Sequence, residues 1–290
     1  MNPGDSLEIF VYNDDLLRRL DSYQRTVIKD GLSVACTSGD KIIVFLVNGQ
    51  HGRYYWSTNN SYSYIEGLDS EFVRDCSSSP VSGGICLSSG FSGEKLEVTL
   101  TPLMSRIVLR SIRCDFSGRP YEGAKLKDAR VYLTNASSVC RVMKTDDFVT
   151  RGTLNTGRLC PEDLALMSDP SMLLKELPPS IGEDFVEVGA ELYCYPNTNA
   201  EEGLGTPFTR LVIEGKLDGT LWYWPINVNR DGICWVEGTP GIDRGKSYVY
   251  DITLTRTGTA DPDLPVEFGT AVVENVVEDW AVEEERYEVF

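Results

Sequence analysis

Residue types on which enzymes and metal sites depend are scarce in this chain. Its 290 residues include one histidine, His51, and no G-x-S-x-G element that could supply a nucleophile beside it. The eight cysteines form no C-x-x-C pair, which argues against a zinc site. Neither a calcium-type acidic loop nor a phosphate-binding glycine loop is present. We therefore expect no enzymatic activity, no catalytic residues, no metal and no cofactor.

Neighbouring acids are the remaining candidates for chemistry. Acidic pairs such as Asp261 and Asp263 could act as the two carboxylates of a glycoside hydrolase. They stand in loop-like sequence of an acidic chain, so solvated charge is the favoured interpretation. The cysteines leave partial disulfide pairing open, although a strand cysteine such as Cys114 is typically a plain buried residue.

Positive charge and long apolar runs are also lacking. The formal net charge is −17, so nucleic acid and anionic membrane surfaces would be repelled. No stretch approaches the roughly 20 apolar residues that span a bilayer. Residues 1–4 have neither the basic nor the apolar region of a signal peptide. We expect no nucleic-acid partner and no membrane insertion, in either a cytosolic protein or the mature form of an exported one.

The chain does contain a succession of short strand patterns separated by turn residues. Residues 41–47 (KIIVFLV) form an apolar run closed by a turn, which is typical of a central strand covered on both faces. Residues 209–214 and 221–228 flank a hairpin turn at Asp218-Gly219. Further strands are expected at residues 7–12, 96–100, 106–116, 129–134, 186–195 and 248–255. This pattern predicts a mostly β protein, a pair of β-sandwiches rather than an α/β enzyme.

Helical patterns are few. Residues 161–177 have an N-terminal proline, acids in the first turn and periodic leucines, and Asp169-Pro170 divides them into two short pieces. Residues 64–76 predict a short helix. The Ser- and Gly-rich residues 77–93 are expected to form a connector.

The C-terminal residues 268–290 combine acidic side chains with large apolar ones. They hold seven acidic residues between Glu274 and Glu288, as a solvated tail would. A solvated tail, however, would not carry so many β-branched and aromatic residues, several of which alternate with charged neighbours. We interpret the segment as a strand that needs a groove. The residues expected to enter that groove are Val272, Val276, Trp280, Val282, Tyr287, Val289 and Phe290.

The second half of the chain carries three motifs in a fixed order: WYWPI at 222–226 after the strand at 209–215, a Tyr-rich strand at 241–254, and DPDLP at 261–265. They are similar to the Y-Y-P-I hairpin, the I-x-R-N-x-x-Y-x-x-x-I-x-L strand and the Pro-containing link of the fimbrillins. Fimbrillins are the subunits of type V pili of Bacteroidota-type bacteria. Gly245 stands here in place of the usual Asn of the second motif.

The first half carries two further matches in family order. Residues 7–12 with residues 36–48 resemble the opening of a fimbrillin, and residues 129–135 resemble its V-Y-L-x-N strand. The similarity thus extends over most of the chain. The positions that match the C-terminal motifs are Tyr223, Pro225, Ile226, Arg244, Tyr248, Asp251, Pro262 and Pro265.

The resemblance implies two β-sandwich domains of transthyretin-like, Greek-key type, a short helical insertion and a C-terminal exchange strand. The implied boundaries are 1–101, 102–265 and 266–290. It also implies a lipidated precursor exported through the outer membrane, whose leader strand a surface protease removes after a basic residue. The favoured mature chain begins just before residue 7, and Arg18-Arg19 and Arg25 are alternative cleavage sites. Subunits of such a fimbrium polymerise head to tail, the C-terminal segment of one filling a groove in the next. Partners would be other copies and related pilins.

Two other interpretations stay open. The aromatic-polar loop at residues 53–64 could stack on sugar rings and make a glycan-binding surface adhesin, although packing of a long loop is the favoured explanation of its aromatics. A pilus tip subunit, which needs only an acceptor groove, or an anchor subunit that keeps its leader strand would share the fold without a self-polymerising role. Host or bacterial surface receptors are further partners that either interpretation leaves open.

Overall fold

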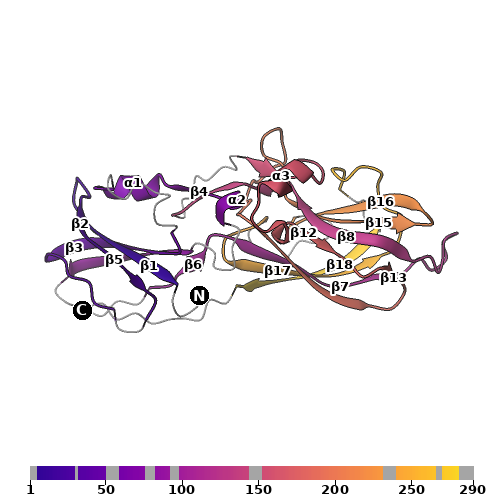
Figure 1. The fold of residues 1–290 in the computed structure, drawn as a ribbon, viewed down its shortest axis with the longest axis horizontal. Coiled ribbons are helices and arrows are strands. Elements are labelled where there is room, and N and C mark those ends of the chain that lie inside the picture. Colours follow the sequence, from indigo (N-terminus) through magenta and orange to yellow (C-terminus); the bar gives the residue numbers. More distant parts are fainter. Residues whose placement is uncertain are drawn as a thin grey trace.

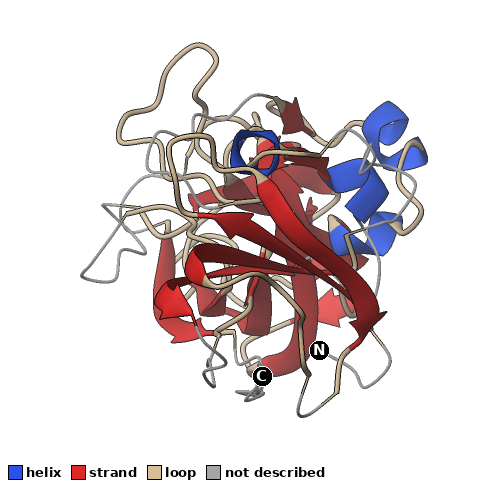
Figure 2. Ribbon diagram, turned by 90° about the vertical axis from the view of Figure 1, so that its left-hand side faces the viewer, coloured by secondary structure: helices blue, strands red, loops and turns tan. Residues whose placement is uncertain are grey.

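Strands build most of the chain, in two lobes that follow one another along the long axis of the molecule (Figure 1). The computed structural model describes residues 5–29, 32–49, 59–75, 82–91, 98–143, 152–230, 240–265 and 270–280. Helices are few beside the strands (Figure 2). The mostly β class predicted from the sequence is confirmed.

The first lobe is built on a five-stranded sheet. Its strands are β1 (Ser6–Asn13), β2 (Leu20–Val27), β3 (Gly39–Val47), β5 (Ser82–Phe91) and β6 (Thr101–Pro102). They lie in the order β2-β1-β3-β5-β6, and each neighbouring pair is antiparallel. Alternate residues of β1 enter separate apolar clusters, Phe10 on one face and Ile9 on the other. Residues 41–47 of β3 are all buried, which confirms the predicted central strand covered on both faces.

The predicted connector at residues 77–93 is wrong over most of its length. Residues 82–91 form β5, which pairs with β3. Strand propensity measures how side chains fit a pleated surface, and backbone pairing with a central strand overrides it here. A Cβ at Gly83 would lie 3.4 Å from the carbonyl oxygen of Val142, so the absence of a side chain suits this close approach. The sequence predicts a strand at residues 96–100. The structure describes residues 98–100 of it, and these three residues do not form a strand.

The second lobe is a sandwich of two sheets. Its main strands are β7 (Ser105–Cys114), β8 (Leu126–Thr134), β12 (Leu174–Glu176), β13 (Ser180–Ile181), β14 (Val186–Cys194), β15 (Arg210–Leu217), β16 (Thr220–Asn227), β17 (Lys246–Leu254) and β18 (Ala271–Asp279). One sheet has the order β12-β8-β15-β16, with β13 also paired to β8. The other has the order β14-β7-β17-β18, in which β7 and β17 are parallel.

The hairpin predicted at Asp218-Gly219 joins β15 to β16. The two turn residues have positive φ angles of 48° and 82°. Glycine adopts such angles at no steric cost and aspartate tolerates them better than most residues, which is why the Asp-Gly pair is a reliable hairpin signal. This prediction is confirmed.

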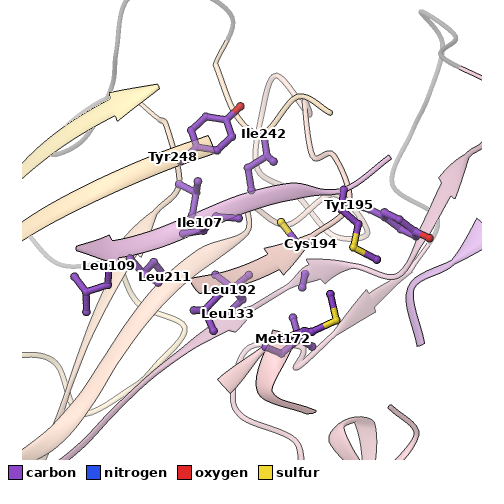
Figure 3. Packing of buried hydrophobic residues seen from close by; sticks show 14 of the residues in the cluster. Ile107, Leu109, Leu133, Met172, Leu192, Cys194, Tyr195, Leu211, Ile242 and Tyr248 are labelled. Atoms are coloured by element: carbon purple, nitrogen blue, oxygen red, sulfur yellow. The ribbon is translucent and has the colours of Figure 1, made fainter. Parts of the chain in front are cut away.

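The core of the second lobe lies between its two sheets (Figure 3). Leu192 of β14, Leu211 of β15 and Ile107 of β7 are fully buried there. Cys114 is buried as expected, and burial raises the pKa of its thiol to about 11. The described cysteines are free thiols, namely Cys36, Cys114, Cys140, Cys160 and Cys194.

The helical predictions are only partly right. Residues 161–177 form α3 (Pro161–Ala165), a 3-10 turn η2 (Pro170–Met172) and then β12. The break lies at Asp169, whose side chain accepts a hydrogen bond from the backbone of Ser171. Residues 62–75 form α1 (Tyr62–Glu66), β4 (Asp69–Glu71) and α2 (Phe72–Asp75). Segments this short cannot hold a helix alone, so contacts with the sheets decide their conformation.

No helix of the described ranges has the length and apolar character that crossing a membrane requires.

The two lobes share buried contacts. β4 pairs with β10 (Val139–Arg141). Within the second lobe, β9 (Ala136–Ser137) pairs with β11 (Thr153–Leu154). Tyr195, which follows β14, donates its hydroxyl to Asp75 of α2 at 2.8 Å and meets the ring of Phe72 edge-on at 5.4 Å. Residues 69–75, which the sequence assigns to the first domain, are therefore attached to the second lobe. The boundaries at residues 101 and 265 stay predictions.

Truncation of a core leucine tests this packing. Leu192→Ala removes a fully buried side chain and should lower the free energy of unfolding by about 2–5 kcal/mol. The control Leu221→Ala, at a side chain that is 40% exposed, should change it by about 0.5 kcal/mol. Urea denaturation followed by tryptophan fluorescence measures both. Equal losses would contradict the position of Leu192 in the core.

Candidate assembly site: the C-terminal strand

The C-terminal strand β18 closes one edge of a sheet in the second lobe. It pairs antiparallel with β17 along all nine of its residues, from Leu254↔Ala271 to Lys246↔Asp279. Among the described strands none pairs with its other edge. An edge strand offers its outward N–H and C=O groups to another chain. This edge is therefore a place where a second molecule can add.

The two faces of β18 have different surroundings, because successive side chains of a strand point to opposite sides. Val273 and Val277 are partly buried against the core. Val272 and Val276 are 54% and 45% exposed. The strand is thus bound to its own domain through one face, while the face that carries the predicted groove-entering residues Val272 and Val276 is open to solvent.

Trp280 follows β18 directly and holds its end in place. Its backbone N–H donates to the carbonyl oxygen of Gly245 at 2.8 Å. Its ring lies 5.6 Å from the ring of Tyr193 and 6.0 Å from the guanidinium carbon of Arg106, measured to ring centroids. Aromatic and cation–π contacts of this kind stabilise by about 0.5–1.5 kcal/mol each.

The structure places three of the seven predicted groove-entering residues. Val272, Val276 and Trp280 are spaced by four residues, an even number, so an extended chain points all three to one side. The other four lie outside the described residues, namely Val282, Tyr287, Val289 and Phe290. The assignment of all seven to an intermolecular groove stays a prediction.

A buried arginine holds the link that precedes β18. Arg210, at the start of β15, is 3% exposed and forms ion pairs with Asp263 and Glu202. The side-chain amide of Asn135 also donates to Asp263, at 3.3 Å. Asp263 is therefore not merely a solvated acid, as its loop-like sequence suggested. The available sequence signal was the single arginine at the head of an apolar strand, because a buried guanidinium requires carboxylate partners.

This ion-pair cluster fixes the point from which the C-terminal segment leaves the sandwich. Asp263 stands between the motif residues Pro262 and Pro265, whose rings restrict the backbone on either side of it. The link is thus restrained both by proline geometry and by the charges on Arg210, and β18 begins only a few residues later.

The motif residues of β17 and of the preceding loop have structural contacts. The buried Tyr248 accepts a hydrogen bond from the backbone N–H of Asp243 at 2.9 Å. Arg244 donates to the carbonyl oxygens of Arg141 and Val142, at 2.8 and 3.1 Å. Both residues therefore position the chain around β17.

Asp251 is the charged motif residue of β17. It receives hydrogen bonds from the guanidinium of Arg110 at 3.0 Å and from the hydroxyl of Ser111 at 2.5 Å. The hydrogen bond from Arg110, with a smaller effect of Ser111, outweighs partial burial and holds the pKa of Asp251 below its usual value. The ion pair ties β17 to its parallel neighbour β7.

The hairpin motif on β16 is also structural. Ile226 is 2% exposed, and Tyr223 exchanges backbone hydrogen bonds with Thr259 at 3.0 and 2.8 Å. Pro225 lies on the last strand of its sheet, where a missing N–H is tolerated. These residues support the fold that presents the C-terminal segment.

A five-stranded first lobe, a two-sheet second lobe and a closing edge strand together make a fimbrillin-type fold. A solved fimbrilin (FimA) from Porphyromonas gingivalis W83 has this fold, with a TM-score of 0.66 at 16% identity, over 97% of this chain and 92% of that chain. The tip fimbrial protein Mfa3 of Porphyromonas gingivalis, solved with a C-terminal truncation, is similar with a TM-score of 0.56 at 12% identity, over 96% and 95% of the two chains. No family model and no curated protein sequence matches. Identities this low establish the fold alone.

Charge substitutions on the two faces of β18 should have different effects. Val277→Asp places a carboxylate on the inner face opposite Tyr248, and an unpaired charge there is costly. Protection of the β18 amides from hydrogen exchange should fall at least about tenfold, or about 1.4 kcal/mol. The control Val276→Asp, on the outer face, should leave protection nearly unchanged. Equal loss in both variants would show that the faces are assigned wrongly.

The lowered pKa of Asp251 predicts an acid-dependent part of stability. A carboxyl whose folded pKa lies below its unfolded value of about 3.9 stabilises fully above that value and loses its contribution as the pH falls through the folded pKa. Asp251→Asn should therefore flatten the fall of the urea midpoint from about pH 5 to pH 2. Asp128→Asn, which removes a 70% exposed partner of Lys216, is the control and should retain the wild-type slope. An unchanged slope in Asp251→Asn would refute the prediction.

Proposed function

We propose that the chain is a structural subunit of a fimbrium that polymerises head to tail by strand exchange. The observation that supports this most directly is β18, an edge strand whose outer face exposes Val272 and Val276. Beyond Trp280 the sequence continues with further β-branched and aromatic residues. The fimbrillin-type fold agrees with a fimbrial role.

Strand addition has a clear physical benefit. An inserted strand satisfies the backbone groups that an edge leaves open, and its alternate side chains fill pockets. Burial of Val282, Tyr287, Val289 and Phe290 would contribute about 1.5–3 kcal/mol each, on the order of 10 kcal/mol before ordering costs. A head-to-tail contact whose rotation does not close into a ring gives a filament.

The C-terminal segment has two parts with different roles, and Trp280 is the last residue of the first part. Residues 271–280 stay in their own sheet, where nine paired residues and the contact of Trp280 with Tyr193 hold them. Residues 281–290 enter the neighbouring subunit. Val272, Val276 and Trp280 then meet that neighbour from the outer face of β18. The acidic residues of the segment keep it in solution until assembly.

The proposal places the protein at the cell surface, in the fimbrium, with other copies of itself and related pilins as partners. A lipidated precursor and the removal of a leader strand belong to the proposal through the family resemblance. Receptors on host or bacterial surfaces are further partners of the assembled fimbrium. A tip subunit, which would need only an acceptor groove, or an anchor subunit, which would keep its leader strand, is the alternative within the same fold.

The glycan-binding alternative gains no support. Tyr62 is 8% exposed and packs edge-on against Tyr12 at 5.6 Å, so its ring is not available to a sugar. The aromatic residues 54–56 lie outside the described residues, as does His51. Across the described ranges, no group of three His, Cys, Asp or Glu residues is placed to hold a metal ion.

Deletion of residues 281–290 should abolish filaments and leave a folded monomer, because β18 and the core are retained. Negative-stain electron microscopy and size-exclusion chromatography measure assembly, and circular dichroism measures folding. A matched control is Glu284→Gln in the full chain, which changes charge within the segment and removes no apolar side chain; it should still assemble. Filaments formed by the deleted chain would refute the donor role.

A disulfide between β17 and β18 tests whether β18 stays in its own sheet during assembly. Val249 and Val276 are cross-strand partners, so the double variant Val249→Cys/Val276→Cys can tie β18 to its own sheet. Oxidised and reduced chains should polymerise equally. Loss of filaments on oxidation alone, with the wild type unaffected, would mean that β18 itself has to leave.

A further inference from the structure

Three polar side chains surround one buried lysine in the first lobe. The Lys41 side chain on β3 is 0% exposed, and Asn13 at the end of β1 is its cross-strand partner. The Lys41 Nζ lies 2.5 Å from Asn13 Oδ1, 2.8 Å from Asp21 Oδ2 and 2.9 Å from Thr37 Oγ1. The amine is therefore shielded from bulk water and held by named partners.

Asp21 supplies the opposite charge that a buried ammonium needs. Asn13 adds an amide, whose carbonyl carbon lies one C=O bond, about 1.2 Å, behind its oxygen; Nζ is therefore within about 3.7 Å of that carbon. Reacting atoms held about 3–3.5 Å apart are close to an attack geometry. The site thus brings together an amine, an amide carbon and a carboxylate.

We propose that Lys41 and Asn13 are joined by an intramolecular amide (isopeptide) bond between their side chains. Asp21 accepts a proton from the Lys41 ammonium, and the lone pair of the neutral amine attacks Cγ of Asn13. A bond forms between Lys41 Nζ and Cγ, and the bond from Cγ to the amide nitrogen breaks. One ammonium and one primary amide become one secondary amide and one ammonium ion, which carries away the proton held by Asp21. No oxidant or cofactor is needed.

Hydrogen bonds hold the Asp21 carboxylate ionised and in place beside the amine. Its Oδ2 receives the backbone N–H of Thr37 at 2.8 Å, and the Thr37 hydroxyl lies 3.0 Å from both carboxylate oxygens. Burial raises the pKa of Asp21, but the hydrogen bonds from Lys41 and Thr37 outweigh it and keep the pKa below its ordinary value. Burial also raises the pKa of the neighbouring Cys36 thiol, so that group stays protonated.

The proton passes from Lys41 to Asp21 along their direct contact of 2.8 Å. This transfer converts the ion pair into a neutral amine and a neutral acid. The Thr37 hydroxyl and N–H hold the carboxylate in position during this change. Asp21 acts in the reaction itself, whereas Thr37 is a positioning residue.

The bond would fix the register of β1 against β3 covalently at Asn13 and Lys41. Hydrogen bonds between strands are lost when a domain unfolds under load, whereas an amide bond persists. That advantage to a subunit of a filament rests on the proposed function; the bond itself does not.

Intact mass spectrometry of the denatured full chain tests the bond, whether or not the protein polymerises. The mass should be lower than the sequence mass by one ammonia molecule. A protease digest should contain a branched peptide that joins the segment around Asn13 to the segment around Lys41. The full sequence mass would overturn the proposal and leave the cluster as a buried ion pair only.

Variants separate this bond from other losses of ammonia, such as cyclisation at an asparagine. Lys41→Arg and Asp21→Asn should both show the full sequence mass, whereas the control Lys216→Arg, at an exposed ion pair, should keep the loss. The wild-type mass needs no variant to fold, so the proposal is falsifiable even if Lys41→Arg is unstable. Persistence of the loss in Lys41→Arg would overturn it.

Discussion

The pairing of β17 on both sides is the constraint on which the second lobe depends. β7 runs parallel to it and β18 runs antiparallel to it, so the backbone groups of β17 are satisfied only when the C-terminal strand is in place. The same strand is therefore part of the sheet and its open edge. An assembly role has to use what this pairing leaves open, namely the outer face of β18 and the residues that follow it.

Buried polar contacts complement this pairing in the rest of the molecule. Tyr195 and Asp75 join the lobes, and Arg210 binds Asp263 where the C-terminal segment departs. Each is a group that would be costly to bury alone, so each requires its partner. A chain built in this way resists separation of its lobes and carries a strand at its edge, and both properties agree with the proposed place in a filament.

Features that depend only on a few neighbouring residues could be predicted from the sequence. The run at 41–47, the Asp218-Gly219 turn and the strand at 246–254 follow from periodicity and turn chemistry. Residues 82–91 escaped prediction because their pairing with β3 overrides a Gly- and Ser-rich composition. The pairing of Arg210 with Asp263 escaped because it joins residues that are distant in the chain and lie close only in the fold.

The amino-acid sequence alone was sufficient to predict a mostly β chain, to find its fimbrillin-like motifs and to predict a strand among residues 268–290. It was also sufficient to show that alternate residues of that strand differ, because side chains alternate along any strand. Folding alone decides that Val273 and Val277 turn inward while Val272 and Val276 face solvent. The reason is that a strand's covered face depends on the register with its neighbour, here β17, and no local pattern contains that register.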